Sequence, residues 1–316
     1  MNYNELHEKT NLAPGWRIAV NRLVGAYSDN TLRGYRSDLS FFETWCQGRR
    51  QAMLPASPET VAAFIAYDAE RSSPSTLRRR LASIRKLHKL LRPDDPVGDE
   101  DVRIALRRAL RSKTQRPQQA LGLNRELRDR LIAACPDTSV GLRNKALIAV
   151  GYDTLCRRSE LVSLRVEDFS ADARGKITVL IRRAKNDPFG NGRLGILSCS
   201  AANHLTMWLA AGRIETGYVF RALGSNSAAD KALHPFSVNR ILKGLAGVAG
   251  VSRRDIRKLS GHSMRVGAAQ DMMASGLGVL PIMQAGGWKS INVVARYIEH
   301  ADLGSLLNQF HSSGGT

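Results

Sequence analysis

Apolar and polar positions alternate along residues 16–111 at the spacing of amphipathic helices. In the segment 75–91, one helical face is apolar and basic residues occupy most of the remaining positions. The apolar positions are Leu77, Leu81, Ile84 and Leu87. The segment 31–45 is also expected to be helical, and Ser57-Pro58-Glu59 is typical of a helix start. We therefore expect this part of the chain to be almost wholly helical.

A break in the pattern divides the chain in two. The stretch 112–119 is polar, contains a proline and lacks periodicity, so it is predicted to be a linker. Beyond it the helical pattern resumes, with one β signal. Residues 176–181 are β-branched and apolar, and 193–197 follow a turn rich in Asn, Asp, Pro and Gly. We expect a helical domain at 1–111 and a mainly α domain with a small antiparallel β-sheet at 120–316.

The net charge narrows the choice of partner. Lys and Arg number 47 against 28 Asp and Glu, which gives +19 and a sequence pI near 10.4. Such an excess favours a polyanion, either nucleic acid or an acidic membrane surface. No apolar run approaches the roughly 18–20 residues that span a bilayer, and the N-terminus is too polar for a secretory signal. These features favour a cytoplasmic protein that binds nucleic acid and has no membrane partner.

Metal-binding patterns are weak in this sequence. The four cysteines form no CxxC pair, which disfavours both a zinc site and a disulfide framework. Three histidines, His204, His234 and His300, have no partners at metal-ligand spacing. The acidic stretch 94–101 lacks an ordered ligand pattern and is interpreted as a solvated loop. We therefore expect neither a metal nor a cofactor.

Three short clusters in the second half carry residues suited to chemistry. They are 155–161, with Arg157, Arg158 and Glu160; 261–265, with His262 and Arg265; and 286–297, with Trp288 and Tyr297. Each alone has a plainer explanation, as a surface salt bridge, a helix terminus or a packed tyrosine. Together with a lysine they supply what phosphoryl transfer without a metal requires: cationic donors for the phosphate oxygens, a nucleophile and a proton source. Arginine suits this task because its planar fork holds two oxygens and keeps its charge.

The same clusters resemble the signature of a known family. The runs 260–269, 282–288 and 292–298 are similar to the C-terminal motifs of tyrosine site-specific recombinases, the phage integrase family, and in particular of its Cre-like type. The run 152–160 resembles the first arginine box of that family. Weaker similarity continues through the N-terminal half, so the resemblance covers nearly the whole chain.

The resemblance implies a role for each residue. Tyr297 would attack the scissile phosphate to give a 3′-phosphotyrosine link and a free 5′-hydroxyl, with His262 as base or orienter. Lys185 would protonate the departing 5′ oxygen, with Lys176 or His262 as alternatives. The phosphate would be held by Arg157, supported by Glu160, and by Arg265 and Trp288. Arg158 replaces a commoner apolar residue of the family, so both arginines of the first cluster remain candidates.

The resemblance also implies an assembly on DNA. Two domains would form a C-clamp around a duplex, and four protomers would act on two sites made of inverted half-sites. The DNA contacts expected in the first domain are Arg33, Arg36, Arg79, Arg80 and Lys86. A C-terminal helix over 302–310 carries one apolar stripe, formed by Leu303, Leu306, Leu307 and Phe310, and would dock into a neighbouring protomer to build the homotetramer.

Two other functions use parts of the same pattern. A type IB topoisomerase shares the nucleophile and the phosphate clamp but works as a monomer, whereas the spacing and the apolar C-terminal stripe favour a recombinase. A DNA-binding regulator with a decayed catalytic site is disfavoured by the complete set of six candidate residues. Both alternatives predict binding to double-stranded DNA, and neither predicts a cofactor.

Overall fold

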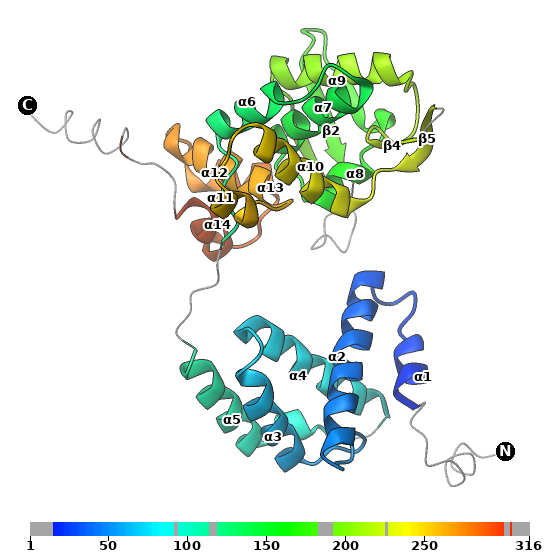
Figure 1. Cartoon of the computed structure of the whole chain (residues 1–316), viewed down its shortest axis with the longest axis vertical. Coiled ribbons are helices and arrows are strands. Elements are labelled where there is room, and N and C mark those ends of the chain that lie inside the picture. Colours follow the sequence, from blue (N-terminus) through cyan, green and yellow to red (C-terminus); the bar gives the residue numbers. More distant parts are fainter. Residues whose placement is uncertain are drawn as a thin grey trace, which may run out of the picture. The chain divides into compact units, whose positions relative to one another are not determined.

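The chain folds into two compact units, 1–117 and 118–316, and the boundary between them falls within the predicted linker (Figure 1). The computed structural model describes residues 15–91, 94–113, 119–182, 192–224, 227–299 and 304.

Helices alone build the described part of the first unit. They are α1 (Gly15–Asn21), α2 (Asp29–Gly48), α3 (Pro58–Ala69), α4 (Pro74–Leu91), a 3-10 turn η1 (Pro96–Gly98) and α5 (Glu100–Arg111). The side chains of Ser28 and Ser57 accept hydrogen bonds from backbone N–H groups in the first turns of α2 and α3. These serine caps, and Pro58 in the first turn, explain why the two helices begin where they do.

Aromatic side chains fill the centre of this unit. The ring of Phe64 packs edge-on against Phe42, with centroids 4.9 Å apart, and against Trp45 at 5.3 Å. All three side chains are buried, and the apolar face predicted for α4 packs on the same cluster. The first unit therefore has a hydrophobic core of its own.

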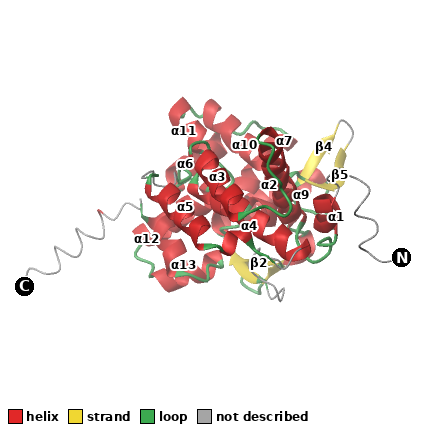
Figure 2. Cartoon of the chain, turned by 90° about the horizontal axis from the view of Figure 1, so that it is seen from below, coloured by secondary structure: helices red, strands yellow, loops and turns green. Residues whose placement is uncertain are grey.

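The second unit is mainly helical and contains two small antiparallel sheets (Figure 2). Its helices are α6 (Arg125–Ala133), α7 (Ser139–Asp153), α8 (Arg158–Ser163), the 3-10 turn η2 (Val166–Asp168), α9 (Cys199–Gly212), α10 (Pro235–Val248), α11 (Arg253–Lys258), α12 (Ser263–Ala274), α13 (Val279–Gly286) and α14 (Ile291–Ile298). Its strands are β1 (Phe169–Ala171), β2 (Ile177–Ile181) and β3 (Arg193–Ile196) in one sheet, and β4 (Arg221–Gly224) and β5 (Ser227–Ala232) in the other.

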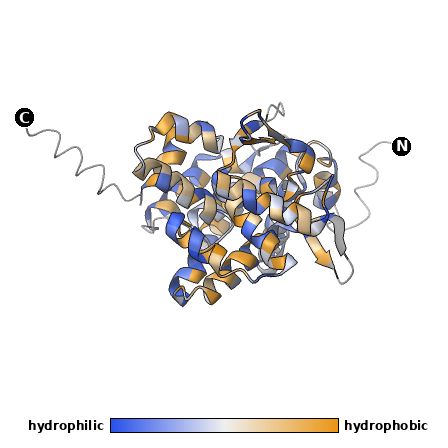
Figure 3. Ribbon diagram, turned by 90° about the horizontal axis from the view of Figure 1, so that it is seen from above, coloured by the Kyte–Doolittle hydropathy of each residue, from blue (hydrophilic) through white to orange (hydrophobic). Residues whose placement is uncertain are grey.

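Helix α7 lies at the centre of the second unit and contacts α6, α8, α9 and α12. Most of its residues are buried, including the polar Arg143 and Asn144. Hydrophobic and hydrophilic residues alternate along the helices of the chain in general (Figure 3). Gly151 permits the close approach of α12, because a Cβ there would lie 2.8 Å from the sulfur of Met264. The end of α7 is thereby held against the start of α12.

The predicted fold class is confirmed: the chain is mainly α, with a small antiparallel sheet. The predicted hairpin is β2 and β3, with Val179 opposite Gly195. The short strands β1, β4 and β5 were not expected, because they lack a run of β-branched residues. Among the described residues, no helix combines the length and the apolar character needed to cross a bilayer.

Candidate active site

The turn between α7 and α8 presents the first arginine. Arg157 is the N-cap residue of α8, and its guanidinium donates to the Glu160 carboxylate at 2.6 Å. The other oxygen of Glu160 accepts from the backbone N–H of Arg157 at 3.0 Å. Because the Glu160 side chain is almost fully buried, it fixes both the backbone and the side chain of Arg157.

Arg158 points elsewhere. Its guanidinium lies over the ring of Phe236, with Cζ 4.4 Å from the ring centre. The stem of its side chain packs on Gly261, where an added Cβ would lie 2.9 Å from the Cβ of Arg158. Of the two neighbouring arginines, Arg157 is therefore the one bound to the buried acid.

Arg265, on α12, is 1% exposed and is held by main-chain oxygens. It donates to the carbonyls of Leu155 and Gly286, each at 2.5 Å. Leu155 has a left-handed backbone, with φ of 50°, a conformation that costs a non-glycine residue about 1–2 kcal/mol. Burial, and next the charge of Arg157, lowers the pKa of Arg265 to about 10, so it is still cationic at neutral pH.

The C-terminal end of α13 presents Trp288. Gly287 ends the helix in the left-handed conformation, with φ of 63°, which glycine adopts without steric cost. The indole covers the preceding turn so closely that a Cβ on Gly286 would lie 2.0 Å from its ring. Cζ of Arg265 lies 4.0 Å from the centre of the Trp288 ring, so the tryptophan covers one face of the guanidinium.

Tyr297 stands beside this tryptophan. It lies near the end of α14, half-buried, with its ring centroid 5.1 Å from that of Trp288. Its backbone carbonyl accepts from the side-chain amides of Gln119 and Gln270, each at 3.2 Å. On the same helix Val294 is buried in the core of the unit, whereas Ile291 is 58% exposed.

His262 immediately precedes α12, three residues before Arg265. The side chain is exposed, and its backbone N–H donates to Ser260 Oγ at 3.2 Å. Partial desolvation, followed by the charges of Arg265 and Arg158, lowers the pKa of its imidazole below the ordinary value. A neutral imidazole at physiological pH has an unprotonated nitrogen and can accept a proton.

Arg193 belongs to the same constellation and was not singled out in the sequence. It opens β3, and its Nη2 lies 3.7 Å from Oε2 of Glu160. Its Nη1 donates to the carbonyl of Ala285 at 2.7 Å. An arginine that begins a short strand carries no distinguishing pattern, so only the fold reveals this contact.

Two expected features lie outside the described residues. Lys185 belongs to the stretch 183–191 between β2 and β3, and the C-terminal stripe of Leu303 to Phe310 follows α14. Among the residues that the structure describes, no group of His, Cys, Asp or Glu is arranged to hold a metal ion.

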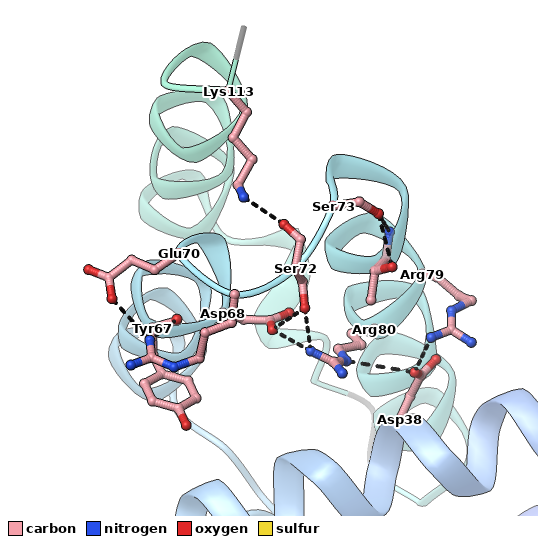
Figure 4. Close-up of polar contacts among 11 residues, drawn as sticks. Asp38, Tyr67, Asp68, Glu70, Ser72, Ser73, Arg79, Arg80 and Lys113 are labelled. Carbon is pink, nitrogen blue, oxygen red and sulfur yellow. Dashed lines mark hydrogen bonds and ion pairs between the residues drawn. The ribbon is translucent and has the colours of Figure 1, made fainter. Parts of the chain in front are cut away.

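The structure separates the five DNA contacts expected in the first unit into two kinds. Arg80 pairs with the buried carboxylate of Asp68, donates to Ser72 Oγ at 2.8 Å and approaches Asp38 (Figure 4). Its guanidinium also lies 3.7 Å over the ring of Phe41, and the side chain is only 16% exposed. Through these contacts Arg80 ties α2, α3 and α4 together, and its role as a DNA contact stays a prediction.

The other four residues lie at the surface of α2 and α4. Arg79 pairs with Asp38 at 2.8 Å but remains half-exposed. Arg33 and Arg36 are exposed and donate to asparagine side chains, and Lys86 lies 5.0 Å over the ring of Tyr27. Side chains of this kind can exchange such surface contacts for phosphate oxygens at little cost.

Together, the helical architecture and the clustered arginines, histidine, tryptophan and tyrosine define a protein of the DNA strand-cutting and rejoining class. Residues 123–303 match the phage integrase family, and residues 22–93 match the phage integrase N-terminal SAM-like domain. The chain belongs to the phage integrase family and is a tyrosine recombinase.

Two relatives extend over most of the chain. The chain is 28% identical over 294 residues to the recombinase Cre of Escherichia phage P1, a match that covers 88% of this chain and 86% of that protein. It is 32% identical over 302 residues to an integrase/recombinase XerD homologue of Selenomonas ruminantium, covering 90% and 86%.

Solved structures share the fold. The Tn1549 transposon integrase in complex with transposon right end DNA superposes with a TM-score of 0.68 at 12% identity, covering 95% of this chain and 99% of that one. The XerH site-specific recombinase bound to palindromic difH substrate gives 0.62 at 16% identity, covering 88% and 78%. At these identities the likeness concerns the fold alone.

Proposed function

We propose that this protein cuts and rejoins DNA at specific sites through a covalent link between Tyr297 and a 3′-phosphate. The cluster of Arg157, Arg265 and His262, with Trp288 between Arg265 and Tyr297 in the chain of contacts, carries the proposal. The two arginines place positive charge where a phosphate would gain charge in the transition state.

In the proposed first step, the Tyr297 hydroxyl oxygen attacks the scissile phosphorus and the bond to the 5′ oxygen breaks. The tyrosine proton passes to His262, and Lys185 gives a proton to the departing 5′ oxygen. Trp288 and Arg265 pack together, so the phosphate would meet a guanidinium whose position is already fixed.

In the second step, a 5′-hydroxyl from the partner duplex attacks the phosphotyrosine and the phenol regains its proton. One phosphodiester bond is lost and one is formed, so the cycle needs no ATP, and the arginines supply the positive charge that other phosphoryl-transfer enzymes take from metal ions. Exchange between two duplexes, each with inverted half-sites, would take place in a homotetramer. The relatives named above come from a bacterium and a bacteriophage, which supports the bacterial cytoplasm as the place of action.

The direct test is the Tyr297→Phe variant. We expect it to bind the target duplex with nearly unchanged affinity and to form no covalent adduct on a nicked substrate, because affinity arises from many phosphate contacts elsewhere. Target duplexes would first be selected from a random pool with the wild-type protein. A persistent adduct in the phenylalanine variant would refute the assignment. Binding without an adduct in the wild-type protein would favour a regulator with a decayed site, and relaxation of supercoils without two-site exchange would favour a topoisomerase.

A further inference from the structure

Arg193 occupies a buried position between two parts of the candidate site. Its side chain is 10% exposed, and its two Nη atoms are directed at protein acceptors, whereas its buried Nε has no hydrogen-bond partner among the described residues. Nη1 donates to the carbonyl of Ala285 at 2.7 Å, while Nη2 lies 3.7 Å from Glu160 Oε2 and 3.8 Å from the sulfur of Cys156. A guanidinium placed in this way is too deep to serve as a surface phosphate contact.

The first partner of Arg193 is Glu160, which holds Arg157 at the start of α8. Glu160 binds Arg157 through one carboxylate oxygen at 2.6 Å and faces Arg193 with the other. A buried carboxylate between two guanidinium groups is stabilised by both charges, and the loss of one leaves the other to set its position alone. Arg193 therefore acts on Arg157 without touching it.

The second partner of Arg193 is the Ala285 carbonyl, which belongs to the turn that presents Trp288. Ala285 directly precedes Gly286, whose carbonyl binds Arg265, and Trp288 follows two residues later. The stem of Arg193 also packs on this turn, since a Cβ on Gly287 would lie 2.9 Å from Cδ of Arg193. One side chain thus touches the support of Arg157 and the support of Trp288.

We propose that Arg193 is a positioning residue of the strand-transfer reaction, which fixes Arg157 through Glu160 and Trp288 through the Ala285 carbonyl. This inference rests on the proposed function, because it assumes that these two residues act on a scissile phosphate. Arg193 would thus connect strand β3 to the two parts of the site that are proposed to hold the phosphate, the turn with Arg157 and the turn with Trp288.

The chain offers a matched control on the other strand of the same hairpin, since Ile181, the residue before Arg182, is paired with Arg193. Arg182 directly follows β2, and it pairs with the buried carboxylate of Asp168. It resembles Arg193 in residue type, in lying beside the loop of the hairpin and in having an acidic partner, although its side chain is 59% exposed. Unlike Arg193, it contacts no member of the candidate site in the described part of the chain.

The test compares Arg193→Gln and Arg182→Gln in single-turnover cleavage of a nicked target, with the full-length protein at saturating concentration. We expect Arg193→Gln to lower the cleavage rate about 100-fold, the size of effect that a displacement of about 1 Å can cause. DNA affinity should change little in either variant. Arg182→Gln should retain the cleavage rate, even where its melting temperature falls.

A second substrate separates positioning from a general loss of structure. In a methylphosphonate, one charged oxygen of the scissile phosphate is replaced by a neutral methyl group, so the reaction depends less on a correctly placed Arg157. The defect of Arg193→Gln should therefore shrink several-fold on the methylphosphonate relative to the phosphate. Arg193→Lys, which keeps the charge without the planar fork, should lie between the wild type and the glutamine variant.

Three results would overturn the inference: a normal cleavage rate in Arg193→Gln, an equal defect on both substrates, or an equal defect in Arg182→Gln. If the glutamine variant does not fold, the lysine variant carries the same comparison of substrates. Failure of the wild-type protein to form any adduct would instead refute the proposed function, so the two failures are distinguishable.

Discussion

The guanidinium of Arg265 lies over the indole of Trp288, with Cζ 4.0 Å from the ring centre. The same indole faces the ring of Tyr297 at a centroid distance of 5.1 Å. Trp288 therefore contacts both the cationic residue and the proposed nucleophile, and any change that moves its ring should alter the position of both side chains.

Gly286→Ala should displace the Trp288 ring, because the new Cβ would lie 2.0 Å from it. We expect cleavage to fall about 100-fold while DNA binding persists. Gly244→Ala is the control, since a Cβ there meets no atom within 4 Å and should raise stability by up to about 1 kcal/mol. Normal cleavage by the Gly286 variant would show that the ring position is unimportant.

Arg80→Ala should destabilise the first unit by about 3 kcal/mol, because it leaves the carboxylates of Asp68 and Asp38 buried with a partner removed. Arg36→Ala, which removes an exposed charge, should leave stability unchanged. It should reduce by about one the slope of the logarithm of the DNA-binding constant against the logarithm of salt concentration. Chemical denaturation and anisotropy titration over a salt series measure the two effects. Native stability with lost DNA affinity in the Arg80 variant would show instead that Arg80 acts as a DNA contact.

Acid should weaken the first unit through His88. Its buried Nε2 accepts from the Ala56 N–H at 3.0 Å, and Nδ1 lies 2.9 Å from the carbonyl of Ile84, so the ring is held neutral. Burial lowers its pKa, and the unfolded chain therefore binds the proton more tightly between the two pKa values.

Stability should thus be fully present above the unfolded pKa of about 6.5 and fall below it, by at most about 1.4 kcal/mol per pH unit from this group. Urea titrations from pH 7.5 to 5 on the wild type and on His88→Gln measure the slope. The variant should be less stable at pH 7.5 and show a flatter profile, and an identical slope would assign the effect to other groups.

Lys185→Ala should cleave ordinary DNA poorly if this lysine is the general acid. The rate should largely recover when the departing 5′ oxygen is replaced by sulfur, because a thiolate leaves without a proton. Single-turnover rates on the two substrates give the ratio. A ratio equal to that of the wild type would move the role to Lys176 or His262.

Truncation after Ala301 should preserve binding of one protomer to a half-site, weaken cooperative filling of the second half-site and block recombination. The reason is the apolar stripe of 303–310, which must be buried on its own domain or on a neighbour. Gel-shift titrations on half and full sites measure cooperativity. Unchanged cooperativity with full recombination would rule out a role in assembly, and a misfolded truncation would indicate packing within one chain.

Local sequence patterns were sufficient for most of the helices and for the hairpin. Serine caps such as Ser28 and Ser57 mark helix starts, and periodic leucines mark the buried face of α4. The candidate site was recognisable because its residues occur in short runs around Arg157, His262 and Tyr297.

Contacts between elements that are distant in the chain could not be predicted from the sequence. Arg79 and Arg80 are neighbours in one basic helix, and no sequence pattern distinguishes them. In the fold, only Arg80 of the two pairs with the buried Asp68 of another helix. Arg193 was missed for the same reason, since its partners lie 33 residues before it, at Glu160, and 92 residues after it, at Ala285. Ion pairs between elements depend on packing, which local periodicity does not encode.

The main-chain anchorage of Arg265 has a consequence for mutational tolerance. Its two acceptors are the carbonyls of Leu155 and Gly286, which every amino acid possesses. Substitution at the first position changes packing and backbone strain but removes no acceptor, and the second position is restricted only by the space beneath the indole. The geometry of Arg265 therefore tolerates substitution of its partners better than that of Arg157. The orientation of Arg157 depends on one carboxylate side chain, which a substitution can remove.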